Sequence, residues 1–254
     1  MNAVVLAGGP LDDVARLQPG APNKAFVDIC GTTLVGRVVG ALRGCAAIGR
    51  MVVVTPENEW GNPQLRDADD FRPDGVHISE SLRNGIAGFP AADSLLIVAS
   101  DMPVLTAAIA CDFVARVEAT DADVIYGCVE KGAHLARFPS VPHTWARMRD
   151  GTYCGGGMFA LKPRAMPQLE RFIEDLGAAR KSPLRLASFF GWDMLARFAL
   201  GRLSVGQAEA RATKILGAPV RALISPYPET AVNVDRVSDV ALARKLVSSG
   251  SASA

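Results

Sequence analysis

The chain has 254 residues, of which 49% are hydrophobic and 21% are charged, and its formal net charge is +1. This apolar content suffices for a substantial core and excludes a disordered chain, while the near-neutral charge provides no global field for nucleic acid or an anionic membrane. The five cysteines are scattered and form no Cys-x-x-Cys pair, so we expect neither a disulfide framework nor a zinc site, and a reducing cytoplasm fits this pattern. The N-terminus has no basic region and its apolar run is short, so we expect neither a signal peptide nor a membrane span.

Short apolar runs alternate with helical patterns along the chain. Continuous apolar runs are typical of strands covered on both faces, and they predict strands over Ala3–Ala7, Met51–Val54 and Leu95–Ala99. Weaker runs predict strands over Val124–Tyr126, Met158–Leu161 and Val220–Ile224. The alternation predicts an α/β fold with a mainly parallel sheet and right-handed crossovers.

Helices are predicted between these strands. One apolar face at helical spacing comprises Leu34, Val35, Val38, Val39 and Leu42. Thr106 can cap a helix that runs towards Glu118. Residues 164–217 have helical patterns and little strand character, so we expect a helical insertion there, followed by a last helix over Ser238–Val247.

A glycine pair ends the first predicted strand. Gly8 and Gly9 either form a tight turn or provide backbone N–H groups that approach a phosphate closely. The pattern is neither Gly-x-Gly-x-x-Gly nor the P-loop motif, which disfavours both of those nucleotide sites. Lys24, in the loop that follows, either reaches phosphate oxygens or is a solvated loop lysine.

Two aspartates follow predicted strands. Asp101 comes after the strand at Leu95–Ala99, and because Thr106 is the better-placed helix cap, Asp101 has no evident structural role. Asp235 precedes the last helix, which Ser238 or Asp239 can cap. Ligands bind beyond the carboxyl ends of parallel strands, and two carboxylates at that edge suit Mg²⁺ bound to phosphate.

Four motifs together resemble those of nucleotidyltransferases of the glycosyltransferase-A type. In chain order they are VVLAGG with PNKAFVDICGTTLVGRVVGAL, then IVASDMPVLT, GTYCGGGMFALKP and VNVDRVSDV. The branch most similar to this sequence is the molybdenum cofactor guanylyltransferase-like (MobA-like NTP transferase) family, and the resemblance covers most of the chain except the helical insertion. It implies a Rossmann-like three-layer α/β/α fold of the nucleotide-diphospho-sugar transferase type, with a mixed, mainly parallel sheet in a single domain over residues 1–254.

The resemblance also implies an activity and its site. The activity is Mg²⁺-dependent transfer of a nucleoside monophosphate from an NTP to a phosphate-bearing small-molecule acceptor, with release of pyrophosphate. Lys24 and Asp101 match catalytic residues, and Asp101 and Asp235 match metal ligands. The nucleotide-binding positions are Leu6, Ala7, Gly8, Gly9, Lys24, Ser81, Asn84 and Gly85. Gly155, Gly156 and Gly157 match the glycine-rich strand beside the acceptor.

The glycine loop departs from the family pattern. The usual Gly-x-Gly-x-Arg is replaced by GGPLDDVARLQPG, which displaces the arginine to Arg16, and Asn23 separates Pro22 from Lys24. The insertion adds a basic cluster, Arg180, Lys181 and Arg185, which either binds an acceptor phosphate or is a solvated helix start.

Two other functions compete with nucleotidyl transfer. A glycosyltransferase on this fold usually carries Asp-x-Asp, whereas this chain has Asp101-Met102-Pro103. A regulatory module that binds nucleotide without catalysis is favoured only by the altered glycine loop. In each case we expect small-molecule partners, no nucleic acid and no membrane, and the chain could form a homo-oligomer.

Overall fold

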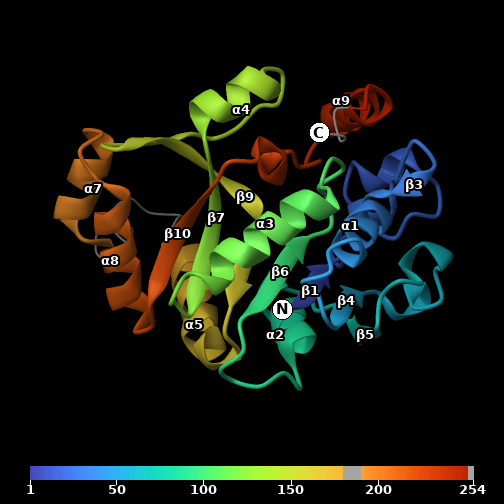
Figure 1. The fold of residues 1–254 in the computed structure, drawn as a ribbon, viewed down its shortest axis with the longest axis horizontal. Helices are drawn as coiled ribbons and strands as arrows, with labels where there is room; N and C mark the ends of the chain where they lie inside the picture. The colour runs from blue at the N-terminus through green and yellow to red at the C-terminus, as the bar shows by residue number, and fades with distance from the viewer. Residues whose placement is uncertain (180–189, 251–254) are drawn as a thin grey trace.

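The computed structural model describes residues 1–179 and 190–250, and this part of the chain contains a central eight-stranded sheet. The strand order is β10-β7-β9-β6-β1-β4-β5, and β8 pairs with β9 outside this path (Figure 1). The strands are β1 (Asn2–Leu6), β4 (Met51–Thr55), β5 (Asp70–Pro73), β6 (Leu95–Ala99), β7 (Val124–Glu130), β8 (Ala146–Met148), β9 (Gly151–Leu161) and β10 (Val220–Ser225). A separate small hairpin joins β2 (Asp28–Ile29) to β3 (Thr32–Thr33).

The sheet is mixed but mainly parallel, as predicted. β1 runs parallel to β4 and β6, β4 to β5, and β7 to β10. β9 is antiparallel to β6, β7 and β8. This arrangement sends the carboxyl ends of β1, β4, β6, β7 and β10 to one edge of the sheet, together with the start of β9.

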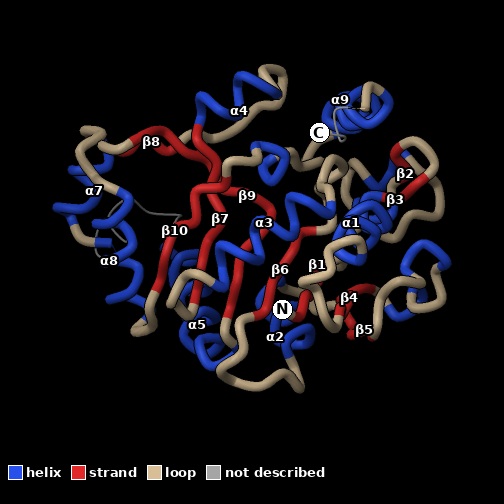
Figure 2. Tube along the Cα trace, viewed as in Figure 1, coloured by secondary structure: helices blue, strands red, loops and turns tan. Residues whose placement is uncertain are grey.

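Helices cover both faces of the sheet and create an α/β/α sandwich (Figure 2). On one face, α1 (Leu34–Arg43) and α3 (Ala107–Glu118) pack in one apolar cluster with Ala3 and Val5. On the other face, α2 (Ile78–Ile86) and α5 (Met166–Ala179) share a cluster with Val4. The strand β1 is thus buried on both sides, which explains its continuous apolar run. The fold class predicted from the sequence is confirmed.

The predicted helix signals also appear in the structure. All five apolar residues of the α1 face are buried, and Thr106 caps α3 by accepting a hydrogen bond from the Ile109 N–H at 3.4 Å. Ser204 caps α8 (Val205–Leu216) in a capping box with Gln207. The last helix, α9 (Val237–Ser248), begins one residue before the predicted position.

Some elements are longer than the sequence predicted, or were not predicted. β7 extends to Glu130 and β9 begins at Gly151, so the glycine run 155–157 lies inside a strand. The sequence analysis did not foresee β5, α2 or the short α4 (Lys131–Arg137). For α2 a signal was present, because Ile78, Leu82 and Ile86 recur at helical spacing.

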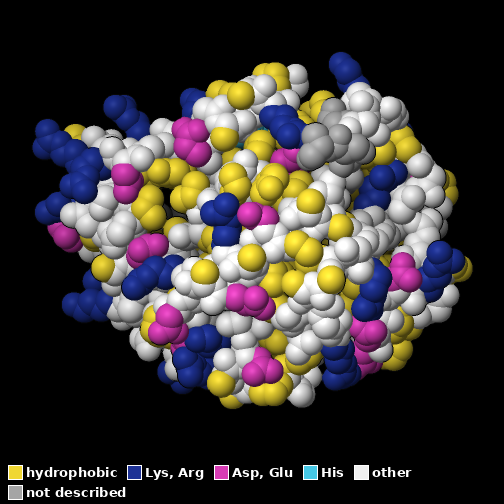
Figure 3. Space-filling view, viewed as in Figure 1, with side chains coloured by type: hydrophobic (Ala, Val, Ile, Leu, Met, Phe, Trp, Pro, Cys, Tyr) yellow, Lys and Arg dark blue, Asp and Glu magenta, His cyan; other side chains and the backbone are white. Residues whose placement is uncertain are grey.

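Between β9 and β10 the described chain is helical, with α5, α7 (Trp192–Ala199) and α8. Lys and Arg side chains gather over α7 and α8 (Figure 3). Arg197 of α7 and Arg202, which follows this helix, are both exposed. The division of the chain into one domain with an insertion at 164–217 stays a prediction. The basic cluster Arg180, Lys181 and Arg185 lies outside the described residues.

The expectation of no disulfide is wrong. Cys45, two residues after α1, is bonded to Cys111 of α3, and their Cα atoms are 5.5 Å apart. The helices α1 and α3 lie side by side on one face of the sheet, which brings together cysteines 66 residues apart in sequence. Cysteine spacing alone does not reveal such a pair.

Among the described helices, none combines the length and apolarity needed to cross a membrane.

Candidate active site

Three oxygen atoms surround the Lys24 ammonium at the carboxyl edge of the sheet. Lys24 Nζ lies 2.6 Å from Asp101 Oδ2 and 2.7 Å from Asp235 Oδ1, and it donates to the Val234 carbonyl oxygen at 3.1 Å. An ammonium group has three N–H donors, so these contacts account for all of them. We call these three oxygens the oxygen cage. The structure therefore brings together three residues that the sequence analysis placed in the site or beside it, although they lie up to 211 positions apart.

Local structure positions Lys24. The residue begins a short 3-10 helix, η2 (Lys24–Phe26), whose cap is the buried Asn23. The Asn23 side chain accepts from the Ala25 N–H at 2.9 Å and donates to the Ala7 carbonyl at 2.9 Å, which ties the loop to the end of β1. Asn23 thus fixes the position from which Lys24 reaches the cage.

Asp101 is held by the segment that carries Asp235. Its side chain is 8% exposed, and its second oxygen accepts from Asn233 Nδ2 at 3.1 Å. Its backbone carbonyl accepts from the Val234 N–H at 3.0 Å. Asn233 was not predicted as a site residue, but its position two residues before Asp235 is a usable signal, because alternate residues of an extended segment share a side.

The electrostatics of the cage are strongly coupled. Burial lowers the pKa of Lys24, but the charges and hydrogen bonds of Asp101 and then Asp235 outweigh burial, so its pKa lies well above the ordinary value. Burial raises the pKa of the Asp101 carboxyl, and the Lys24 ammonium opposes that rise. The pKa of Asp101 lies above its ordinary value even beside the ammonium, so a cation in the cage favours the ionised carboxylate.

The glycine loop lies next to Asp74. Gly9 has φ +133°, a conformation that favours glycine, and its N–H donates to Asp74 Oδ2 at 3.2 Å. A Cβ atom on Gly8 would lie 2.3 Å from the Asp74 Cβ. Leu6 ends β1, and the buried Ala7 follows it. The loop thus presents a backbone N–H to a carboxylate, as it would to a phosphate oxygen. Asp74 was not predicted as a site residue, because no local pattern sets it apart from other loop aspartates.

The predicted nucleotide-binding residues Ser81, Asn84 and Gly85 form a second group. The Ser81 hydroxyl accepts from the Gly75 N–H at 2.9 Å, and Asn84 Nδ2 donates to the Pro73 carbonyl at 3.0 Å. Both side chains thereby hold the loop that contains Asp74. Gly85 faces the sheet, where a Cβ atom would lie 2.5 Å from Val4 Cγ1. In the described structure Gly85 allows α2 to pack closely on β1 and β4.

The predicted acceptor glycines lie at close approaches in β9. A Cβ on Gly155 would meet the Tyr126 hydroxyl at 2.1 Å, one on Gly156 the Thr230 carbonyl at 2.9 Å, and one on Gly157 the Met102 Sδ at 2.6 Å. Gly157 thus adjoins the residue after Asp101. The strand can pass this near to the aspartate loop only without side chains.

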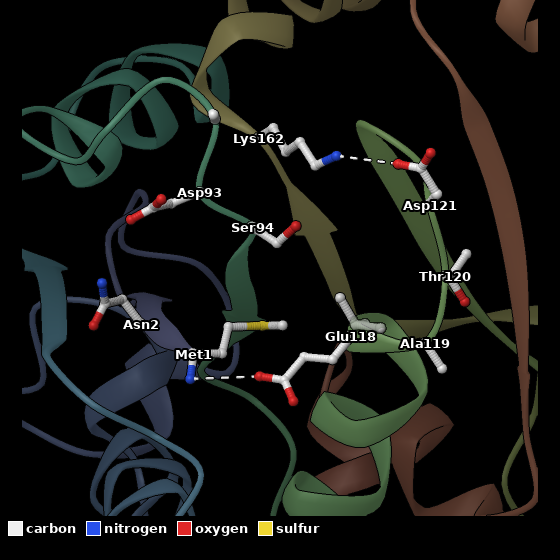
Figure 4. A pocket seen from close by; sticks show the side chains of 11 residues that line it. Met1, Asn2, Asp93, Ser94, Glu118, Ala119, Thr120, Asp121 and Lys162 are labelled. Atoms are coloured by element: carbon white, nitrogen blue, oxygen red, sulfur yellow. Dashed lines mark ion pairs between the residues drawn. The ribbon is translucent and has the colours of Figure 1, made fainter.

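The two larger cavities described lie at different edges of the sheet. One of about 630 Å³ lies away from the cage, between Met1 and Lys162, and it contains the ion pairs Met1–Glu118 and Lys162–Asp121 (Figure 4). The other, of about 390 Å³, is lined partly by Asn233 and Asp235. The second cavity adjoins the oxygen cage, so it belongs to the candidate site despite its smaller size.

The metal prediction rests on two carboxylates. No group of three or more His, Cys, Asp or Glu side chains in residues 1–179 and 190–250 could hold a metal ion. Asp101 and Asp235 nevertheless direct one oxygen each at a single cation, the Lys24 ammonium. Carboxylate and carbonyl oxygens are ligands that Mg²⁺ accepts, with water and substrate phosphates completing its coordination. The donor set therefore fits a phosphate-bound Mg²⁺.

Comparisons with known proteins agree with this geometry. The MobA-like NTP transferase domain matches residues 3–188. A hypothetical transferase from Thermus thermophilus is 37% identical, with a TM-score of 0.81, and the match covers 94% of this chain and 98% of that one. A comparison with curated proteins finds no match.

Two more distant structures share the fold. The 4-diphosphocytidyl-2C-methyl-D-erythritol synthase from Anaerococcus prevotii is 10% identical, with a TM-score of 0.58 and 97% of each chain covered. A nucleotidyl transferase from Methanothermobacter thermautotrophicus is 20% identical, with a TM-score of 0.53 and coverage of 96% of this chain and 95% of that one. The family match spans most of the chain, and we conclude that the protein belongs to the MobA-like NTP transferase family and is a nucleotidyltransferase.

Proposed function

We propose that the protein transfers a nucleoside monophosphate from an NTP to a phosphate-bearing small molecule, with Mg²⁺ as cofactor. An oxygen of the acceptor phosphate attacks the α-phosphorus of the NTP and forms a new P–O bond. The bond between the α-phosphorus and the β-bridging oxygen breaks, and pyrophosphate leaves with the electron pair. An acceptor phosphate is already ionised at neutral pH, so the step needs no general base.

One observation carries this proposal: the oxygen cage lies beside the glycine loop at the carboxyl edge of the sheet. Asp101 and Asp235 would hold Mg²⁺, which when bound neutralises phosphate charge. Lys24 would release the carboxylates and turn its ammonium to the α- and β-phosphates, where charge grows as pyrophosphate departs. Gly8 and Gly9 would offer backbone N–H groups to the triphosphate. Positioning and charge neutralisation supply most of the catalysis in phosphoryl chemistry.

Asp74 adds a requirement to nucleotide binding. Its carboxylate occupies the Gly9 N–H in the described structure, and two anions cannot share that donor. The Asp74 side chain must therefore move when a phosphate oxygen takes its place, or it must turn to hydrogen-bond donors of the nucleotide.

The test begins with nucleotide binding and then measures turnover. Each of the four NTPs is added with Mg²⁺ in a thermal-shift assay, since a ligand that binds only the folded state raises Tm. The NTP with the largest shift is then incubated with a panel of phosphomonoesters, and released pyrophosphate is measured. We expect Asp101→Asn to abolish this release while retaining the fold, and the exposed Asp121→Asn to behave as wild type.

The competing functions give different results. Turnover of a nucleotide-sugar without pyrophosphate release would support a glycosyltransferase. NTP binding without turnover across the panel would support a regulatory module. Wild-type turnover in Asp101→Asn would overturn the assigned site.

Two further expectations are part of the proposal. The sequence analysis inferred a reducing compartment from the cysteines, and the Cys45–Cys111 disulfide removes that reason. The proposed cytoplasmic location therefore rests on the proposed use of NTP. Fractionation of the producing cells tests it. Sedimentation of the purified chain tests whether it forms a homo-oligomer.

A further inference from the structure

A cavity of about 390 Å³ opens directly beside the oxygen cage. It lies between β7, the start of β9, the loop before β8 and the segment before α9. The residues used below are Tyr126, His143, Thr144, Gly155, Asp235 and Arg236, all of which line it. We call it the β9 pocket. Its volume is within the range of small-ligand sites, and Asp235 belongs to both the pocket and the cage.

The charged side chains of the β9 pocket differ in the partners that they have. Asp235 is paired with Lys24 at 2.7 Å. Asp239, at the same wall, accepts from the backbone N–H groups of Asp235 and Arg236 at 3.1 and 2.9 Å. Arg236 is exposed and forms no ion pair with any residue in the described ranges. Arg236 is thus the one Lys or Arg side chain among the described residues that line the pocket, and an anion bound to it would also face the carboxylates of Asp235 and Asp239.

The walls of the pocket are formed by packed rings. The Tyr126 hydroxyl lies over Gly155, where any side chain would collide with it. The His143 ring contacts those of His134 and Trp145, with centroids 4.4 and 5.4 Å apart, and His134 is fully buried. Rings held in this way keep the cavity open, because they cannot fill it without unpacking the cluster.

The location restricts the ligand. A group that attacks the α-phosphorus must approach it beside Asp101 and Asp235, since these residues would hold the metal. The glycine loop and Lys24 come from the other side of the cage, at the end of β1. The β9 pocket thus opens on the side that the nucleotide leaves free.

Building on the proposed function, we propose that the β9 pocket binds the acceptor and that Arg236 binds the acceptor's phosphate. The acceptor is a phosphomonoester whose organic part lies between Tyr126, His143 and Thr144. A guanidinium binds phosphate through two parallel N–H donors, so Arg236 orients the phosphate and leaves one of its oxygens to face the α-phosphorus. The predicted acceptor contacts of Arg180, Lys181 and Arg185 lie outside the described residues and stay a prediction.

The test measures binding without turnover. The protein is loaded with the α,β-methylene analogue of the NTP that gives the largest thermal shift, because the methylene bridge cannot be cleaved. Glycerol 3-phosphate, glycerate and glycerol are then titrated calorimetrically as probes. We expect glycerol 3-phosphate to bind, glycerate to bind at least fivefold more weakly, and glycerol not to bind detectably.

Variants locate the binding in the pocket. We expect Arg236→Gln to weaken glycerol 3-phosphate binding at least fivefold, Arg236→Lys to have an intermediate effect, and the exposed Arg66→Gln to match wild type. Thr144→Trp, which places a large ring in the cavity, should also weaken it. Affinity for the NTP analogue should be unchanged in all four variants.

Several results would overturn the proposal. Wild-type affinity for glycerol 3-phosphate in both Arg236→Gln and Thr144→Trp would show that the probe binds elsewhere. Tighter binding of glycerate would refute the phosphomonoester class, and displacement of the analogue by the probe would place it in the nucleotide site. Failure of the protein to bind any NTP or analogue is a separate outcome, which would refute the proposed function itself.

Discussion

Replacing Lys24 with methionine should convert the oxygen cage into a metal site that fills without nucleotide. In the wild type the ammonium already occupies the point at which Asp101 and Asp235 converge. A divalent ion must displace it, and the displaced ammonium then needs another anion, which a triphosphate provides. Methionine has similar length and no charge, so the variant leaves two carboxylates and a carbonyl oxygen without a cation.

The cost of this substitution follows from the burial of the pair. The Lys24 side chain is 28% exposed and that of Asp101 is 8% exposed. Removal of one partner from a buried ion pair costs about 3–5 kcal/mol, and we take about 3 kcal/mol because Lys24 retains some access to solvent. For a chain of this size each kcal/mol lowers Tm by about 2–4 °C, so Tm should fall by about 6–12 °C.

Metal binding should restore most of this loss. A ligand at 100 times its Kd stabilises the folded state by about 2.7 kcal/mol, close to the amount removed. We use Mn²⁺ as the probe and measure the free ion by electron paramagnetic resonance, without nucleotide. Lys24→Met should bind Mn²⁺ at least tenfold more tightly than wild type, a difference of about 1.4 kcal/mol, and should recover its Tm as Mn²⁺ is added.

Two further variants serve as controls. Lys24→Arg retains a cation and should bind Mn²⁺ as weakly as wild type, whereas Lys24→Met combined with Asp235→Asn should lose the gained affinity. Equal Mn²⁺ affinity in wild type and Lys24→Met would refute the reasoning, because it would mean that the ammonium and the metal do not compete for the same oxygens.

Three more substitutions test the fold. A disulfide that closes a loop of this length contributes about 2–4 kcal/mol, so reductant should lower the Tm of the wild type but not that of Cys45→Ala; a wild-type Tm indifferent to reductant would contradict the Cys45–Cys111 bond. Two hydrogen bonds from Arg164, at 2.6 and 2.9 Å, hold the pKa of Asp123 below its usual range. The resulting stability is present above the unfolded pKa of about 3.9 and is lost as pH falls through the lower folded value. Asp123→Asn should therefore lower Tm by about 2–4 °C at pH 7, and urea titrations should show this difference shrinking below pH 4, whereas a difference constant with pH would argue against the ion pair. Gly85→Ala should lower the free energy of unfolding by about 1–3 kcal/mol, because it overpacks α2 against β1. Gly61→Ala, at an open position, should leave the urea midpoint unchanged, and equal effects of the two substitutions would refute the packing argument.

The sequence predicted the sheet well because its strands are continuous apolar runs. Ala3–Ala7 and Leu95–Ala99 correspond to β1 and β6, and strands of this type depend on burial on both faces, which composition reveals. The extension of β9 back to Gly151 was missed because glycine has low strand propensity. The strand needs glycine at positions 155–157 because neighbouring groups lie too close for a side chain. These contacts come from residues distant in sequence and leave no local pattern.

The two aspartates of the site could be predicted from the sequence, but the hydrogen bonds that hold the site together could not. The rule that strand ends meet at one edge placed Asp101 and Asp235 together. Asn23 and Asn233 escaped prediction, because an asparagine that holds a backbone group has the same local sequence as one exposed to solvent. The disulfide was missed for a similar reason, since only the packing of α1 on α3 joins its cysteines.

The oxygen cage has a consequence for how the protein is made. Lys24 lies near the beginning of the chain and Asp235 near its end, 211 positions later, and the Asn233–Asp101 bond spans 132 positions. A growing polypeptide that already contains β1, β4 and β6 therefore has a buried aspartate with only part of its support. Contacts of such long sequence separation form slowly, and these cannot form until the segment that contains Asn233 and Asp235 has been synthesised. A nascent chain that lacks this segment would have no oxygen cage and would be inactive.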